Sequence, residues 1–197
     1  TWLMMIFGIA VTSGVIGALL DPYSPQRLMA IVAVVTIGAV LLTAAAIHGI
    51  ERRVIPVRLP DETPLLKGLA EVWSEPRTRI FTVFIFLSMT AFFLQELILE
   101  PYAGLVFAYT PGQSTSLSGA QHGGMFVGML AVGIAVSGLR IGTLRLWVTA
   151  GCLGSAVSLA VIAALGQAGV GLLTPAVTIL GVFNGMFAIA SIGAMMQ

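Results

Sequence analysis

Charged residues are what this sequence most lacks. Only 9% of its 197 residues are Asp, Glu, Lys or Arg, whereas 58% are hydrophobic and the mean hydropathy is +1.04. A soluble domain usually has about a quarter of its residues charged, because its surface faces water. The composition therefore excludes a soluble globular domain and indicates an integral membrane protein, whose surface faces lipid.

The sequence also has a single cysteine and a net charge close to zero. The single cysteine, Cys152, excludes an intramolecular disulfide and a cysteine metal cluster. The net charge of +1 argues against a nucleic-acid partner. The first residue already lies in a long apolar run without a charged segment or a cleavage site, so we do not expect a signal peptide. The sequence also lacks an initiator Met and ends in an apolar run, so we expect a piece of a longer protein.

Long apolar runs are what the sequence has in abundance. A membrane-spanning helix needs roughly 20 apolar residues. We therefore expect an all-α, polytopic transmembrane bundle with spans at residues 1–20, 28–47, 80–99, 120–138, 146–165 and 172–196. The GxxxG pairs Gly124 with Gly128 and Gly181 with Gly185 predict that helix backbones approach closely.

The basic residues of the connections predict the orientation. Lys and Arg number one in 21–27, six in 48–79, none in 100–119, two in 139–145 and none in 166–171. Basic loops face the cytoplasm in multi-pass proteins. The loops 48–79 and 139–145 are therefore expected in the cytoplasm, and so are both ends of the chain.

The long polar connection divides the chain. We expect two spans in residues 1–47, a cytoplasmic connection in 48–79 and four spans in 80–197. Within the connection, Thr63 can cap a helix whose first residue is Pro64. Its apolar face would carry Leu65, Leu69, Val72 and Trp73. Such a helix either lies on the membrane surface or packs against the cytoplasmic ends of the bundle.

Ionisable residues inside a membrane are costly and usually functional. Gln95, Glu96 and Glu100 lie at the end of the third span, and the two carboxylates are four residues apart, on one helical face. They could carry protons, bind a cation or accept hydrogen bonds from a neighbouring subunit. Alternatively, Glu100 simply reaches interfacial water. Pro101 is predicted to end or kink the helix.

His122 is the other candidate. Pro111-Gly112 predicts a turn, and the Ser and Thr residues after it suit a helix start. Gly123 and Gly124 are expected to leave open space beside His122. The imidazole could bind a metal or titrate. The interpretation that spacing favours is an interfacial histidine bonded to a loop carbonyl. His48 is expected on the opposite side of the membrane, so the two histidines cannot share one metal.

Motifs of enzyme chemistry are missing from the sequence. It has no nucleophile–base constellation, no glycine loop for phosphate and no clustered metal ligands. From these absences we predict that the chain is not an enzyme.

One long motif resembles a known family. The match to the PucC/LhaA family, the bacteriochlorophyll-delivery branch of the major facilitator superfamily, is carried by Phe93–Glu96, Leu99–Gly104, Thr110–Gly119 and Gln121–Gly124. Major facilitators have two six-helix halves, so the resemblance implies that this chain holds about helices 5–10 of 12, with the long basic connection at the midpoint. The loop 138–145 departs from the facilitator pattern, because it has no acidic residue where facilitators carry a gating loop.

The resemblance implies an assembly factor for light-harvesting antenna complexes in the bacterial inner (intracytoplasmic) membrane. Such a protein would bind bacteriochlorophyll, with carotenoid or lipid as further ligands, and deliver it to antenna polypeptides around the reaction centre. The alternatives are a proton-coupled transporter that uses Glu96 or Glu100, and a pigment-free structural subunit. His122 would ligate the chlorin magnesium, and the other pigment-binding candidates are Gln95, Gln113, Gln121 and Tyr102.

Overall fold

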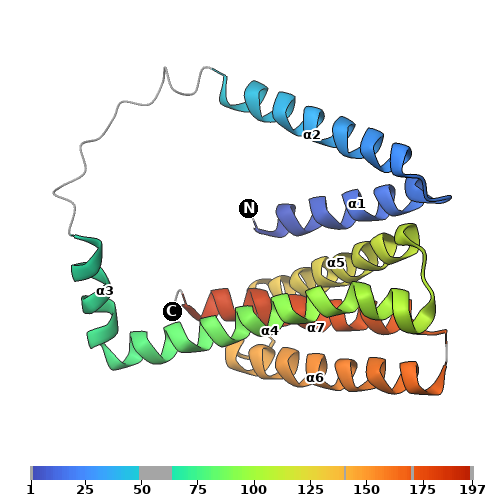
Figure 1. Cartoon of the computed structure of the whole chain (residues 1–197). Coiled ribbons are helices and arrows are strands. Elements are labelled where there is room, and N and C mark those ends of the chain that lie inside the picture. The colour runs from blue at the N-terminus through green and yellow to red at the C-terminus, as the bar shows by residue number, and fades with distance from the viewer. Residues whose placement is uncertain (1, 49–63, 140, 170, 196–197) are drawn as a thin grey trace. The chain divides into compact units, whose positions relative to one another are not determined.

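The computed structural model describes residues 2–48, 64–139, 141–169 and 171–195. All regular structure in these residues is helical. In chain order the helices are α1 (Trp2–Leu20), α2 (Pro25–Ile47), α3 (Leu65–Ser74), α4 (Pro76–Phe107), α5 (Pro111–Gly133), a π-helical turn (Ile134–Gly138), α6 (Leu144–Ala168) and α7 (Leu173–Met195) (Figure 1).

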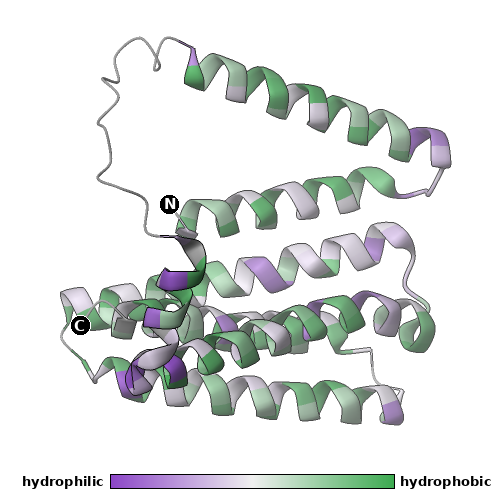
Figure 2. Ribbon diagram, turned by 60° about the vertical axis from the view of Figure 1, so that its left-hand side comes forward, coloured by the Kyte–Doolittle hydropathy of each residue, from purple (hydrophilic) through white to green (hydrophobic). Residues whose placement is uncertain are grey.

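Six of these helices are long and apolar enough to cross a membrane. The shortest, α1, has 19 residues. At 1.5 Å per residue it is about 28 Å long, close to the thickness of the hydrocarbon layer. Hydrophobic and pale segments dominate the long helices in Figure 2. The predicted fold class, a polytopic bundle of transmembrane helices, is confirmed.

The helices group into two units, Thr1–Leu28 with Glu100–Gln197, and Met29–Leu99. In the first unit α5 lies between α1 and α7, and α7 lies between α5 and α6 (Figure 1). This makes α5 the central helix of the unit. The predicted division into 1–47, 48–79 and 80–197 stays a prediction.

Glycines set the distance between α5 and α7. A methyl group built on Gly124 or Gly128 of α5, or on Gly181 or Gly185 of α7, would collide with the opposite backbone. Because lipid supplies no hydrophobic drive between helices, such close contact is what holds them together. The predicted GxxxG packing is confirmed. The carbonyls that the glycines face belong to Thr178 and Val182 for the α5 pair, and to Gln121 and Met125 for the α7 pair.

A second glycine contact joins α5 to α1. A Cβ on Gly112 would lie 2.8 Å from the Gly17 carbonyl oxygen, and one on Gly119 would lie 2.7 Å from the Gly14 nitrogen. Phe7 and Phe126 extend this contact along the two helices, with ring centroids 5.3 Å apart. Sequence analysis missed this interface, because its glycines are not spaced as GxxxG.

The contact between α6 and α7 combines small residues with one polar pair. A Cβ on Gly151 would lie 2.7 Å from the Phe187 nitrogen. The Ser155 hydroxyl donates a hydrogen bond of 2.8 Å to the amide oxygen of Asn184. A polar bond between helices resists separation in lipid, where water cannot replace it.

Pro101 was expected to end or kink the helix, and the expectation that the helix ends there is wrong. Helix α4 continues through Pro101 to Phe107, so most of the expected connection 100–119 is helical. Proline removes one backbone hydrogen bond. A helix in a membrane retains the other bonds, because no water is present there to bond its carbonyl groups instead.

The predicted turn at Pro111-Gly112 is also wrong, since α5 begins at Pro111. Proline suits the first helical position, where its missing N–H would be unbonded anyway. Thr110 caps the helix by accepting from the Gln113 nitrogen at 3.2 Å, and the Gln113 amide oxygen accepts from the Thr110 nitrogen at 3.0 Å. Only residues 108–110 separate α4 from α5.

The short helix of the connection is present but begins one residue later than expected. Helix α3 starts at Leu65, and Pro64 occupies the capping position instead of the first helical one. Thr63, the predicted cap, lies outside the described residues.

The glycine contact between α5 and α7 predicts that a larger side chain at a contact glycine destabilises the protein. Gly128→Leu should lower the free energy of unfolding by about 1–3 kcal/mol, because the side chain must push α7 away. Gly133→Ala is the matched control on the same helix, since no atom lies within 4 Å of its Cβ position. Unfolding in mixed micelles of increasing SDS content, followed by circular dichroism, measures both. Equal stability of the two variants would contradict the packing.

Candidate functional site

Three of the polar residues expected near the end of α4 and the start of α5 lie together. The Ser118 hydroxyl donates to the Glu100 carboxylate at 3.3 Å. The Ser118 backbone carbonyl pairs with Nδ1 of His122 at 2.9 Å. Glu100 comes from α4 and the other two from α5, so Ser118 connects the predicted carboxylate to the predicted histidine.

The hydrogen bond of His122 defines the role of one ring nitrogen. A backbone carbonyl can only accept, so Nδ1 carries a proton and donates to the Ser118 carbonyl. The partner is a carbonyl of α5 itself, four residues earlier, instead of a loop carbonyl. Only 5% of His122 is exposed, so its side chain is buried between helices of the unit.

The neighbouring Gln121 points elsewhere. It is 4% exposed, and its backbone carbonyl faces Gly181 of α7. Successive residues on a helix are about 100° apart, so Gln121 and His122 lie on different faces of α5. The two candidates are therefore adjacent in sequence without forming one binding surface.

His122 has the right chemistry for a chlorin magnesium but restricted access. An imidazole whose Nδ1–H is held by a carbonyl presents Nε2 to a metal, which is the usual arrangement of a histidine ligand. Among the described residues, no three side chains of His, Cys, Asp and Glu gather as a metal site. His122 could therefore contribute one ligand at most, and its side chain is buried within the unit.

Tyr102 is already bonded between helices. Its hydroxyl donates to the Ile162 carbonyl oxygen of α6 at 2.9 Å and lies against Gly166. Its ring also meets Phe107 edge-on at 5.7 Å, and Phe107 meets Tyr109 at 6.2 Å. This row of aromatic rings went unnoticed in the sequence. Aromatic residues at helix ends are its signal, because such rings favour the membrane–water interface.

Gln113 and Asp21 secure the start of α5. The Gln113 amide takes part in the cap described above, so this candidate has a structural partner. The Thr110 hydroxyl donates to the Asp21 carboxylate at 3.0 Å. The sequence alone did not indicate Asp21 as a partner of Thr110, because the two residues are 89 positions apart. A carboxylate beside a helix N-terminus is favoured by the helix dipole.

Gln95 and Glu96 belong to the unit Met29–Leu99. Both are half-buried on α4, and Glu96 lies one turn before Glu100 on the same continuous helix. The amide nitrogen of Gln95 is buried without a hydrogen-bond partner among the described residues. Gln95 is therefore the candidate whose polar group most needs a further partner.

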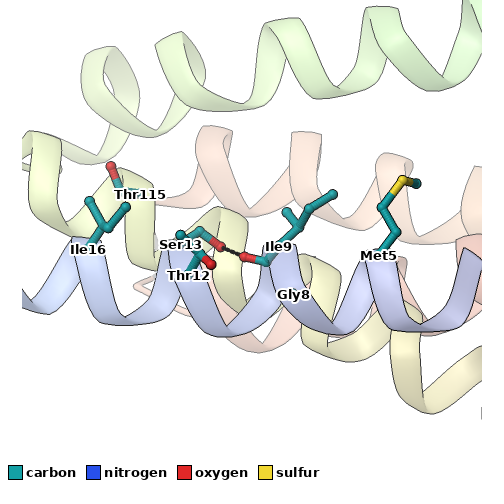
Figure 3. A pocket seen from close by; sticks show the side chains of 7 residues that line it. All are labelled: Met5, Gly8, Ile9, Thr12, Ser13, Ile16 and Thr115. Atoms are coloured by element: carbon teal, nitrogen blue, oxygen red, sulfur yellow. Dashed lines mark hydrogen bonds between the residues drawn. The ribbon is translucent and has the colours of Figure 1, made fainter. Parts of the chain in front are cut away.

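A shallow groove runs along α1 (Figure 3). Its volume is about 450 Å³, and the Ser13 hydroxyl inside it donates to the Ile9 carbonyl at 2.6 Å. Because that hydroxyl is bonded within α1, the groove offers a largely apolar lining. No atom lies near the Cβ position of Gly8, so the middle of the groove is open. Its lining residues are Met5, Gly8, Ile9, Thr12, Ser13 and Ile16 of α1, and Thr115 of α5.

Two curated relatives come from Rhodobacter capsulatus. The bacteriochlorophyll synthase 44.5 kDa chain is 64% identical over 198 residues, which is 100% of this chain and 46% of that protein. Protein PucC is 26% identical over 121 residues, 59% of this chain and 26% of that protein. The chain therefore spans less than half the length of these relatives. No solved structure matches it significantly.

The prediction that the chain is not an enzyme is contradicted. The relative that is 64% identical over the whole chain bears the name of a synthase chain. The prediction depended on missing soluble-enzyme motifs. Those motifs describe particular families of active site, so their absence was too narrow a basis.

The bond of Tyr102 predicts a measurable loss. Tyr102→Phe should lower the free energy of unfolding by about 0.5–1.5 kcal/mol, because the Ile162 carbonyl loses a donor. Tyr23→Phe is the control, since Tyr23 is 49% exposed. Titration with SDS measures both variants, and an unchanged midpoint for Tyr102→Phe would refute the bond.

A family model covers the whole chain. It is described as PUCC protein and matches residues 1–197. The resemblance seen in residues 93–124 thus extends over all six spans. The chain belongs to the PUCC protein family.

Proposed function

We propose that this chain is the membrane-embedded part of a factor that assembles light-harvesting antenna complexes and binds bacteriochlorophyll. The observation that carries the proposal is the match of the PUCC family to every residue. The name of the relative that is 64% identical supports a link to bacteriochlorophyll. The proposed location is the bacterial inner (intracytoplasmic) membrane, with basic loops and both chain ends in the cytoplasm.

The apolar surfaces suit pigment tails, lipid and antenna helices. On α6, Leu153, Val157 and Val161 are 46–64% exposed and recur every four residues, so they form one stripe. Such a stripe accepts lipid, a carotenoid or the helix of an antenna polypeptide. The groove of α1 is narrow and apolar, which suits a hydrocarbon tail better than a polar solute.

His122 is the proposed axial ligand. Bacteriochlorophyll, when bound, supplies a magnesium ion that accepts one nitrogen lone pair. The Ser118 carbonyl accepts from Nδ1 and so fixes the orientation of the imidazole ring. Because His122 is 5% exposed, pigment binding is expected to require that α5 separate from a neighbouring helix. Gln95, with its unpaired amide, is the proposed donor to a ring carbonyl.

The proposed fold of the complete protein is that of a major facilitator. The chain covers 46% of its longer relative, which agrees with about six of twelve helices. Helices α1 and α2 would then be the last two helices of the first half, and α4 to α7 would be the first four of the second.

The proposal predicts an absorption signature that depends on His122. The full-length protein, purified from a phototrophic host, should carry near-infrared bacteriochlorophyll bands, and His122→Ala should reduce them by at least about tenfold, since removing a metal ligand costs that much affinity. His48→Ala is the matched control, because it removes the other histidine. Equal bands in both variants would exclude His122 as the ligand, and a pigment-free protein would overturn the proposed function.

A second candidate function is that of a chain of a bacteriochlorophyll-forming enzyme. The synthase name of the relative favours it. The purified full-length protein should then convert a bacteriochlorophyll precursor into product in proportion to its concentration, measured by chromatography. Stoichiometric release of bound pigment without conversion would favour the assembly factor instead. Catalytic turnover would favour the synthase.

A further inference from the structure

Helix α3 differs from every other helix of the chain in its amphipathic character. Its apolar side chains Leu66, Leu69 and Trp73 are 80%, 59% and 53% exposed. At about 100° per residue they fall within a sector of roughly 60°. Lys67 and Glu71 lie outside this sector, on another side of the helix. The helix therefore has an apolar face that no described part of its own unit, Met29–Leu99, covers.

The chain turns sharply between α3 and α4. Pro76 begins α4, and a proline disfavours helical backbone in the residue before it. Glu75 accordingly is extended, with φ −85° and ψ 116°. Its carbonyl accepts from the Arg79 nitrogen at 2.9 Å, and its carboxylate accepts from the Thr78 hydroxyl at 2.8 Å. The sequence therefore fixes a corner here, and α3 leaves the direction of α4 (Figure 1).

This corner stands directly before the apolar run of a candidate membrane span. Arg77 and Arg79 occupy the first turn of α4, and the apolar run of the span begins at Ile80. Four residues of helix rise about 6 Å, so Pro76 lies within the headgroup layer when Ile80 enters the hydrocarbon. Because only Glu75 separates the two helices, the end of α3 is held at the same depth.

We propose that α3 is an interfacial anchor that lies in the plane of the membrane, with Leu66, Leu69 and Trp73 inserted at the boundary of headgroups and acyl chains. The occupant of the apolar face is lipid, because the helix is continuous with a span and turns at the membrane surface. Tryptophan favours this depth, and Lys67, Arg77 and Arg79 can meet lipid phosphates. The anchor does not depend on the proposed pigment function.

Trp73 itself can report the insertion. The chain has three tryptophans, so Trp2→Phe with Trp147→Phe leaves Trp73 as the only one. The chain would be reconstituted in nanodiscs of phosphatidylcholine and phosphatidylglycerol, with bromine placed either high or low on the acyl chains. Because an interfacial helix inserts about 5–10 Å, high bromine should quench Trp73 emission at least about twofold more than low bromine. Aqueous iodide should quench it weakly.

Two results would overturn the anchor. Strong iodide quenching without bromolipid quenching would place α3 in water, and protection from both quenchers would place it against protein. Leu69→Glu should raise iodide quenching, whereas Glu71→Gln, on the polar side, should leave it unchanged.

A second measurement avoids the tryptophan substitutions. In a Cys152→Ser background, which removes the only cysteine, Leu69→Cys should react at least about tenfold more slowly with a membrane-impermeant maleimide than Lys67→Cys does, because lipid covers only the apolar face. Equal rates would also refute insertion.

Discussion

The structure depends on one constraint, that a backbone crossing hydrocarbon must satisfy its own hydrogen bonds. Helices meet this constraint, but they then have no hydrophobic reason to associate, because lipid is as apolar as their side chains. The chain solves the second problem with glycine. Helix α5 brings Gly112 and Gly119 to α1, and Gly124 and Gly128 to α7, so one helix holds its two neighbours by backbone contact.

The same constraint explains where the polar side chains go. Tyr102 donates to a carbonyl of α6, and His122 bonds to a carbonyl of its own helix. Asp21 and Gln113 meet the unpaired start of α5. Tyr102, His122 and Gln113 thus each have a hydrogen-bond partner in the arrangement described. The proposed binding of pigment at His122 would therefore require a different arrangement of the helices, because only 5% of His122 is exposed.

Sequence analysis predicted what depends on composition and period. The six spans follow from hydropathy, and the α5–α7 contact follows from the spacing of Gly124 with Gly128. Sequence analysis failed for features that depend on the membrane environment or on contacts between distant parts of the chain. Pro101 was expected to end or kink a helix, but α4 continues past it, because a backbone in hydrocarbon retains its remaining hydrogen bonds. The partnership of Asp21 with Thr110 could not be found, since no local pattern connects residues 89 apart.

The link between α4 and α5 has a geometric consequence. It is only three residues long, and Ala108 within it has a φ of 54°, a conformation that few residues other than glycine adopt. A link of three residues keeps the end of α4 within about 14 Å of the start of α5. It therefore keeps Tyr102, bonded to α6, and Thr110, bonded to Asp21, at the same end of the unit. The length of the link is therefore as much a part of the fold as the glycines themselves.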